Sequence, residues 1–593
     1  MFRSCRQYSD GDELDEVGED VIPIEPNIDP DPQNDEIEEI NYEPDYFHDE
    51  PWFPLDKYDD VESEEVEKPY NLRQTPARLK WQEKYGSVFH TYNVLKGIKQ
   101  YGDETKESMK KEMSQLLQKG VFHPVRYDEL TSTQKSRVLR SMMLLKRKRS
   151  GQLKSRFLVD GSGQIRSLSA VNPSSPTVSI EALFIIAAIT AMEKRHKVTI
   201  DVEGAYLHAD MVGEVRLKVD ALIADILCEL EPTYENYRLQ DRSIVVMLDK
   251  ALYGCIESAK LFYDNISKVL LDFGFEKNPY DHCVFNKIMY DHQCTVAIYV
   301  DDLKISCEDR RGVDDVLAEL KRVYKVINVH EEDIVDYLGM DFDYSIPGMV
   351  KISMKSMIEQ ILEDFPTKET SRTPATAELF QVDENSPLLD DGRREGFHSL
   401  VAKLLYMAKR ARPDILTAVI FLTTRVLKST EQDWVKLLKI IKYLNGTKEL
   451  TLHLSANEDI TISSFIDASF ANHPDGKSHT GEMITLGGGA VYSKSSKQKL
   501  VTRSSTEAEL VGLSDGLPTV LWVKNFLESQ GYKADAVIHQ DSKSTITLAE
   551  KGKSTTNRTR HVNIRYFFVK DKIDSKEVKI KYLPTEEMIA DFF

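Results

Sequence analysis

Alternating apolar and polar positions predict a β-hairpin over residues 294–307. Every second residue over 296–300 is apolar, the period of a strand with one buried face, and a second apolar run follows two acids, Asp301 and Asp302. Turns favour aspartate, so this pair also fits an ordinary turn. A third carboxylate nearby would make the hairpin tip a site for hard divalent cations. Asp201, which alternates with apolar residues in a β-type run of its own, is the candidate.

Helical spacing of apolar residues predicts helices over residues 104–120 and 180–193, and a further helix that ends at Gly274. Residues 354–446 are predominantly helical by the same criterion. From about residue 460 the pattern changes to strands mixed with helices. Its expected order is strand 464–470, strand 483–486, strand 491–494, a helix from 506, strand 536–540, a helix, strand 578–583 and a final helix.

Three aspartates of this last region lie within predicted strands and helices or at their ends. Asp467 lies in its first strand, Asp541 closes the fourth, and Asp591 lies in the final helix. Ser504 and Glu507 have the spacing of a helix capping box, which gives Glu507 a structural role. Glu509 has no such role and is therefore the candidate for catalysis.

Charge is distributed unevenly along the chain. The net charge of −20 comes from residues 1–67, which hold 25 acids and 3 bases; the other 526 residues hold 72 acids and 74 bases and sum to +2. The main part of the chain can therefore carry basic grooves. The densest basic run, residues 146–149 followed by Lys154 and Arg156, fits a solvated loop or an import signal. Because a β-type run follows, we prefer a hairpin whose cations meet phosphates.

The 593 residues, 41 % of them hydrophobic, are enough for several domains. No apolar run approaches the length of a membrane span, and we expect a soluble intracellular protein. The six cysteines show no metal-ligand spacing and are expected to be reduced. The acidic, proline-containing residues 1–70 are expected to form a disordered linker.

Several motifs together resemble the reverse transcriptases of copia-type long-terminal-repeat retrotransposons, over roughly residues 75–593. Those of the polymerase palm are Thr199-Ile-Asp-Val-Glu-Gly-Ala-Tyr-Leu207, Leu252-Tyr-Gly254 with Ser258, and Tyr299-Val-Asp-Asp-Leu303. Those of the copia-type branch are Tyr337-Leu-Gly339, Arg412-Pro-Asp414, Ser504-Ser-Thr-Glu-Ala-Glu509, Arg560-His-Val-Asn-Ile-Arg-Tyr566 and Tyr582-Leu-Pro-Thr-Glu586.

The resemblance implies an α+β multidomain fold: a right-hand polymerase with fingers, palm and a helical thumb or connection, followed by an RNase H-like α/β domain. The implied division is a linker over 1–70, fingers and palm over 71–345, a thumb or connection over 346–456, and the RNase H-like domain over 457–593.

The resemblance also implies roles for single residues of the palm. Asp201 and Asp301 match catalytic metal ligands, Asp302 an accessory acid, and Val202 a ligand through its backbone carbonyl. The substrate-binding residues it implies are Tyr206, which excludes a ribose 2′-hydroxyl, Arg156 and Lys148, which grip the triphosphate, Gly254, which passes under the templating base pair, and Tyr299.

In the C-terminal region, Asp467, Glu509, Asp541 and Asp591 match the four metal-binding acids of ribonuclease H. The implied cofactor of each active site is a pair of Mg²⁺ ions, with Mn²⁺ as an alternative. The implied partners are an RNA template, a DNA primer, an RNA/DNA hybrid and deoxynucleoside triphosphates, with the integrase and Gag particle proteins of the same element as further partners and no membrane.

Zinc-knuckle, aspartic-protease and integrase motifs are missing, so we expect a C-terminal segment of a polyprotein or the remnant of a copy. The implied location is a cytoplasmic virus-like particle, with nuclear entry left open. The chain ends two residues after Asp591, where the family's final helix continues, and this puts the nuclease in question more than the polymerase. The alternative functions are a catalytically inactive, element-derived protein that binds nucleic acid, and ribonuclease H alone.

Overall fold

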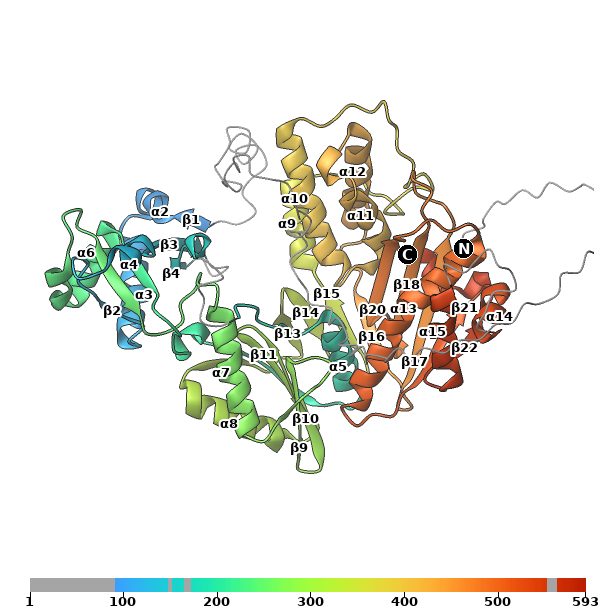
Figure 1. Ribbon diagram of the computed structural model, residues 1–593, viewed down its shortest axis with the longest axis horizontal. Coiled ribbons are helices and arrows are strands. Elements are labelled where there is room, and N and C mark those ends of the chain that lie inside the picture. Colours follow the sequence, from blue (N-terminus) through green and yellow to red (C-terminus); the bar gives the residue numbers. More distant parts are fainter. Residues whose placement is uncertain (1–90, 148–151, 165–171, 552–562) are drawn as a thin grey trace, which may run out of the picture. The chain divides into compact units, whose positions relative to one another are not determined.

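The computed structural model describes residues 91–147, 152–164, 172–551 and 563–593 (Figure 1). The described strands form four sheets, each of which contacts helices. The expected α+β multidomain fold is confirmed. The predicted linker over 1–70 and Lys148 lie outside the described residues. None of the helices described is both long and apolar enough to cross a membrane.

The first sheet is built from residues 91–248. Its strand order is β1 (Thr91–Asn93), β3 (Leu139–Arg147), β6 (Arg216–Val219), β7 (Ile244–Leu248) and β2 (Phe122–Pro124), with β4 (Leu153–Val159) paired to β3. The helices of this region are α2 (Val94–Tyr101), α3 (Asp103–Gln118), α4 (Ser132–Ser136) and α6 (Ala221–Leu230). Strands β3 and β4 form the antiparallel hairpin predicted beside the basic run. Helix α3 packs on β4, and the backbone N–H of Phe157 donates to Glu112 at 3.0 Å.

The second sheet carries the predicted acidic hairpin. Its strand order is β12 (Ile327–His330), β5 (His196–Val202), β11 (Asp302–Cys307), β10 (His292–Tyr299), β9 (Val284–Met289) and β8 (Glu276–Lys277). Helices α7 (Ser258–Asp272) and α8 (Arg310–Tyr324) also belong to this region, and α8 packs against β5 and β11. Strands β10 and β11 pair in antiparallel register and turn at Val300 and Asp301, so the hairpin prediction is confirmed.

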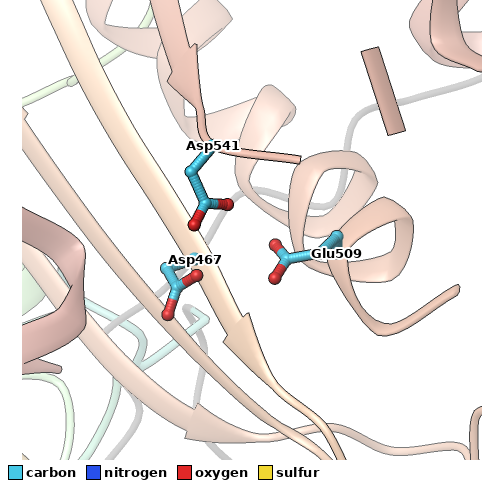
Figure 2. A group of neighbouring side chains, drawn as sticks. All are labelled: Asp467, Glu509 and Asp541. Atoms are coloured by element: carbon cyan, nitrogen blue, oxygen red, sulfur yellow. The ribbon is translucent and has the colours of Figure 1, made fainter. Parts of the chain in front are cut away.

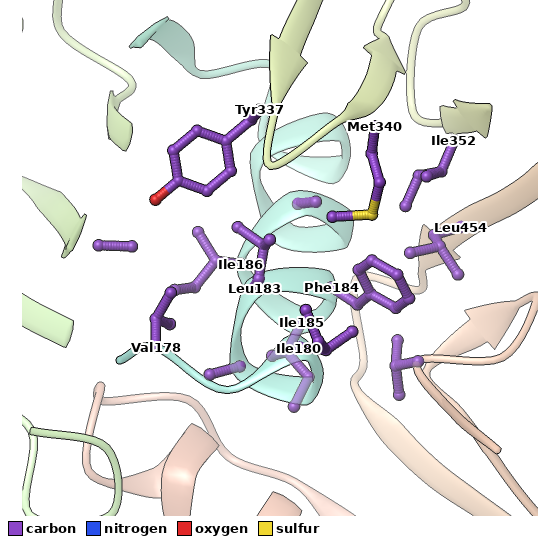
Figure 3. Close-up of a cluster of buried hydrophobic side chains, with 14 of the residues drawn as sticks. Val178, Ile180, Leu183, Phe184, Ile185, Ile186, Tyr337, Met340, Ile352 and Leu454 are labelled. Atoms are coloured by element: carbon purple, nitrogen blue, oxygen red, sulfur yellow. The ribbon is translucent and has the colours of Figure 1, made fainter. Parts of the chain in front are cut away.

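The predicted apolar helix α5 (Ile180–Met192) is buried on nearly all sides. It packs against the third sheet, whose order is β13 (Ile334–Tyr337), β14 (Met340–Asp343), β15 (Val350–Ser353), β16 (Leu452–Ala456) and β19 (Gly487–Gly488). Figure 3 shows side chains of α5 facing Met340, Ile352 and Leu454 on these strands. A helix that is apolar all round needs such cover on every side.

Four α-helices lie between β15 and β16 in the sequence: α9 (Lys355–Asp364), α10 (Asp391–Ala408), α11 (Leu416–Thr423) and α12 (Glu431–Gly446). The helical character predicted for residues 354–446 is confirmed, although the periodicity singled out stripes only for α9, α11 and α12. Arg412, 2 % exposed, holds the turn after α10 by donating to Asp414 at 2.7 Å and to the carbonyl of Thr447 at 3.1 Å.

The fourth sheet has the order β20 (Tyr492–Lys497), β18 (His479–Thr485), β17 (Thr461–Ser469), β21 (Asp535–Gln540) and β22 (Lys579–Tyr582). Strand β17 pairs antiparallel with β18 and parallel with β21. The helices of this region are α13 (Ser505–Glu528), α14 (Lys543–Lys551) and α15 (Asn563–Asp574), so two helices stand where one was predicted between β21 and β22. The prediction of a final helix was also wrong. The chain there forms two 3₁₀ turns, η8 (Thr585–Glu587) and η9 (Ile589–Phe592). Hydrogen bonds between residues three apart close both turns, as is common in short helical segments.

Candidate functional site

Asp201 and Asp302 face each other across neighbouring strands. Asp302 on β11 is the register partner of Asp201 on β5, so both side chains leave the same face of the sheet, with Cβ atoms about 5 Å apart. Asp301 precedes Asp302 in the hairpin turn, where Val300 has a φ of 57°. A β-branched residue in this left-handed region is strained, so the surrounding structure holds the turn in an unfavourable conformation. Local turn geometry and sheet pairing thus bring acids from two distant motifs together.

Burial and mutual repulsion shift the pKa values of the hairpin acids. Burial, followed by the charges of Asp301 and Asp201, raises the pKa of Asp302 to about 7. Burial and the charge of Asp201 likewise raise the pKa of Asp301, which Arg156 opposes. Half-buried carboxylates that repel one another fit a hard divalent cation, because its charge offsets both effects.

Tyr206 and Arg156, both predicted to bind substrate, contact the same ring. Tyr206 lies on the 3₁₀ helix η3 (Ala205–His208), with its ring centroid 4.6 Å from that of Tyr253. The guanidinium carbon of Arg156, on β4, lies 4.2 Å from the Tyr253 centroid. Burial, followed by the charge of Asp301, raises the pKa of Tyr206 to about 12. The two predicted residues are therefore brought together near the acids.

Gly254 lies where the chain passes close to β4. Its φ is +94°, and a Cβ atom added to it would lie 2.1 Å from the carbonyl oxygen of Val159. Only glycine fits this position. The close approach expected of Gly254 is thus accounted for by the protein's own backbone, and its predicted contact with a templating base pair stays a prediction.

Two further predicted residues border the hairpin tip. Val202 ends β5, and its backbone N–H donates to the carbonyl of Asp301 at 3.4 Å. Tyr299 ends β10 as the register partner of Asp302 and is half-buried. Both residues adjoin the acids, as predicted from the sequence, while their roles remain predictions.

Asp467, Glu509 and Asp541 form a second acidic cluster (Figure 2). They come from β17, α13 and the residue after β21, and one carboxylate oxygen of each lies within 4.8 Å of the other two. Among the residues described, this is the one group of three potential ligands that meets that limit; Asp201, Asp301 and Asp302 do not. The carboxylates converge on one point, where a hard cation fits.

Burial, followed by repulsion between neighbouring carboxylates, shifts the pKa values of this cluster. Burial raises the pKa of Glu509 to about 9, and the charges of Asp467 and Asp541 act in the same direction. Burial also raises the pKa of Asp467 to about 7, with a hydrogen bond to Asp591 as the next cause. Asp591, on η9, therefore touches the cluster through Asp467, although it is not one of the three convergent acids.

Glu507 has a capping role, but not through the full capping box that was predicted. Ser504 accepts a hydrogen bond from the backbone N–H of Glu507 at 3.2 Å. The Glu507 carboxylate, however, accepts from the N–H of Arg503 at 2.8 Å rather than from that of Ser504. Its side chain is thus engaged at the helix start, whereas Glu509 faces the cluster.

Sequence reasoning missed three residues that contact candidate metal ligands and one that contacts two candidate substrate-binding residues. Thr585 donates to Asp541 at 2.7 Å and Gln540 to Glu509 at 3.4 Å. Asn328 donates to Asp201 at 3.0 Å. Tyr253, between Arg156 and Tyr206 in the contact network, lies inside a recognised motif, which is a signal that could have found it. Thr585 lies inside the recognised motif over residues 582–586, so the same signal could have found it, whereas Gln540 and Asn328 lie on elements whose pairing the sequence does not reveal.

Comparison with known proteins identifies related sequences. A profile described as reverse transcriptase (RNA-dependent DNA polymerase) matches residues 129–377. The chain is 25 % identical over 501 residues to the retrovirus-related Pol polyprotein from transposon TNT 1-94 of Nicotiana tabacum, covering 82 % of this chain and 36 % of that one. It is also 25 % identical over 521 residues to the truncated transposon Ty1-A Gag-Pol polyprotein of Saccharomyces cerevisiae, covering 84 % of this chain and 42 % of that one.

A solved structure of a foamy viral protease-reverse transcriptase, described as in complex with double-stranded DNA, aligns with a TM-score of 0.48 at 12 % identity, over 81 % of this chain and 70 % of that one. The chain spans roughly two fifths of the length of the two polyproteins that it matches.

Proposed function

The chain belongs to the Ty1/copia-type reverse transcriptase family, and on this premise we propose that it is an RNA-directed DNA polymerase with a fused ribonuclease H. The observation that carries the polymerase proposal is the register pairing of Asp302 with Asp201 beside Asp301 at the hairpin tip. Nucleotidyl transfer requires carboxylates of this kind in one place.

In this proposal Asp201, Asp301 and the carbonyl of Val202 hold two Mg²⁺ ions, with Asp302 as an accessory acid and Mn²⁺ as an alternative metal. The raised pKa values of Asp301 and Asp302 support it, because bound cations would offset the repulsion. Such ions supply activation of the primer 3′-hydroxyl and stabilisation of the leaving phosphate oxygen.

The substrate residues act on the incoming deoxynucleoside triphosphate. Arg156 presents its guanidinium to the triphosphate, helped by Lys148, because arginine pairs with phosphate through a planar fork. Tyr206 excludes a ribose 2′-hydroxyl by occupying its space. Gly254 and Tyr299 border the nascent base pair. The contacts of Arg156 and Tyr206 with one ring, beside the acids, support this division of roles.

The second activity is cleavage of the RNA strand of an RNA/DNA hybrid. Asp467, Glu509 and Asp541 would hold the metal pair, and Asp591 would complete the set through its contact with Asp467. The convergence of three carboxylates within 4.8 Å supports this role. A hybrid is recognised by its backbone shape and 2′-hydroxyls, so no base-reading element is needed.

We assign residues 71–345 to the fingers and palm, 346–456 to a helical thumb or connection, and 457–593 to the ribonuclease H-like domain. The partners are an RNA template, a DNA primer and the RNA/DNA hybrid, together with the integrase and Gag proteins of the element. The proposed location is a cytoplasmic virus-like particle, since the related polyproteins belong to transposons.

Two substitutions separate the two activities. We expect Asp301→Asn to abolish Mg²⁺-dependent extension of oligo(dT) on poly(rA) while hybrid cleavage continues, and Asp541→Asn to have the reverse effect. Asp272→Asn is the matched control, because Asp272 lies on α7 in an exposed ion pair with Lys268 and should leave both activities intact.

If both variants kept both activities, the assignment of these acids would be wrong. Template–primer binding by the natural chain without any incorporation of dTTP would favour the catalytically inactive binding protein instead. Cleavage without extension would indicate a ribonuclease H alone.

A further inference from the structure

Tyr253 has no role in the proposed reaction, yet it is the shared contact of two residues that have one. The Arg156 guanidinium lies 4.2 Å from its ring centroid, and the Tyr206 ring centroid lies 4.6 Å away at an interplanar angle of 48°. Arg156 comes from β4 and Tyr206 from η3, so Tyr253 joins two elements that are distant in the sequence.

The backbone of Tyr253 is locked in place. Its carbonyl accepts a hydrogen bond from the N–H of Val159 at 2.8 Å. The next residue is Gly254, where a Cβ atom would collide with Val159, and a Cβ atom on Gly161 would lie 2.2 Å from the carbonyl oxygen of Gly254. Val159 and Arg156 belong to the same strand, so the backbone of Tyr253 is held beside the strand that carries Arg156.

This group of side chains lies beside the hairpin acids. The charge of Asp301 acts on the hydroxyl groups of both Tyr206 and Tyr253, and that of Arg156 acts on Asp301. Tyr206 has a second aromatic neighbour in Phe262, with centroids 6.3 Å apart. Tyr206 is thus supported by two rings, whereas Tyr253 is the ring that the structure records under Arg156.

We propose that Tyr253 is a positioning residue for nucleotide selection: its ring holds Arg156 and Tyr206 at a fixed separation, and so sets where the triphosphate and the sugar of an incoming deoxynucleoside triphosphate lie. The inference rests on the proposed function. It adds that charge recognition and sugar selection are coupled through one side chain.

The coupling has a definite energetic basis. A guanidinium over a tyrosine ring and a tilted pair of aromatic rings each stabilise a fixed geometry. Without the ring, the long Arg156 side chain regains rotamer freedom and Tyr206 loses one of its supports. Both losses weaken nucleotide binding and sugar discrimination rather than the bond-making step.

The test compares Tyr253→Leu, which removes the ring, with Tyr253→Phe, which removes only the hydroxyl. Extension on poly(rA)/oligo(dT) gives KM and kcat for dTTP and for UTP. We expect Tyr253→Leu to raise KM for dTTP about tenfold and to reduce the preference for dTTP over UTP about tenfold, with kcat within about twofold. We expect Tyr253→Phe to behave as the natural chain does.

Tyr234→Leu is the matched control, because Tyr234 is a buried tyrosine of the first-sheet region whose hydroxyl donates to the carbonyl of Phe122 at 3.4 Å. If the effect of Tyr253→Leu came only from a general loss of packing, Tyr234→Leu would show it too. We expect instead that the preference of Tyr234→Leu for dTTP over UTP is unchanged. Tyr253→His, with a smaller planar ring, provides a second variant and should show an intermediate loss if Tyr253→Leu does not fold.

Binding can be measured without catalysis. A primer ended by a dideoxynucleotide cannot be extended, so the protein forms a complex with this primer, poly(rA), Mg²⁺ and dTTP. We expect Tyr253→Leu to weaken the affinity of this complex for dTTP about tenfold. Unchanged KM and sugar preference in Tyr253→Leu, or equal losses in Tyr253→Phe, would overturn the inference while leaving the polymerase intact. A natural chain that neither extends the primer nor forms this complex would instead overturn the proposed function, and the inference with it.

Discussion

Asn328 donates its side-chain amide to Oδ2 of Asp201 at 3.0 Å. It is the register partner of Asp201 on β12, the strand that flanks β5 on the side away from Asp302. Asn328, Asp201 and Asp302 therefore form one row across three strands. A carboxylate with one oxygen engaged in this way has fewer orientations open to it, which would favour metal binding by the other oxygen in the proposed function.

We expect Asn328→Ala to raise the Mg²⁺ concentration for half-maximal primer extension about fivefold, because Asp201 loses one charge-assisted hydrogen bond in an exposed setting. Hybrid cleavage should not change. His330→Ala, two residues along the same strand, is the control for the loss of an exposed side chain. An unchanged Mg²⁺ requirement in Asn328→Ala would show that the hydrogen bond has no part in the reaction.

Gly254→Ala should lower the free energy of unfolding by several kcal/mol, measured by thermal denaturation. The added methyl group meets the Val159 carbonyl at 2.1 Å, and the backbone at φ +94° is unfavourable for alanine. Gly348→Ala is the control, since Gly348 has a φ of +79° and no atom of the described residues lies within 4 Å of its Cβ position; backbone strain alone should cost this variant about 1 kcal/mol. Equal shifts in the two variants would contradict a steric role for Val159.

Glu509→Gln should abolish hybrid cleavage and, without metal, raise the melting temperature. The substitution removes a buried acid whose pKa is raised to about 9 by burial and by repulsion from two aspartates. Glu507→Ala should show the opposite combination: cleavage is retained, and about 1 kcal/mol of stability is lost with the cap. Differential scanning calorimetry and a cleavage assay on each variant measure both effects.

Glu482 should make the stability of the fourth sheet depend on pH. The side chain is fully buried on β18, neither carboxylate oxygen has a hydrogen-bond partner among the described residues, and burial raises its pKa from 4.5 to about 8. Below pH 4.5 the acid is neutral in the folded and the unfolded chain. Between pH 4.5 and 8 only the unfolded chain ionises, so stability falls as pH rises.

Glu482→Gln should therefore be more stable than the natural chain at pH 8, by on the order of a few kcal/mol, and little different at pH 4.5. Melting temperatures over this pH range measure the difference. Glu528→Gln, at the exposed end of α13, is the control. A difference between Glu482→Gln and the natural chain that does not grow with pH would show that the carboxyl group is ionised or solvated in the folded state.

The sequence alone was enough to predict the helices and strands that depend on the pattern of neighbouring residues. The hairpin around Asp301, the apolar helix α5 and most strands of the fourth sheet follow from periodicity, because the period of apolar residues reports which face is buried. Helix α10 was missed as a separate stripe, and the last helix proved to be two 3₁₀ turns, because local patterns at helix ends and in mixed sequences are weak. The distinction between Glu507 and Glu509 also came from spacing, although the hydrogen bond of Glu507 went to Arg503.

Tertiary structure decided which distant residues meet. The sequence named Asp201 and Asp302 separately, but only the pairing of β5 with β11 sets them opposite each other, and only the pairing of β12 with β5 brings Asn328 to Asp201. The contacts of Tyr253 likewise depend on β4 passing Gly254. Such pairings close long loops, and the whole buried core, rather than any local pattern, determines which of them form.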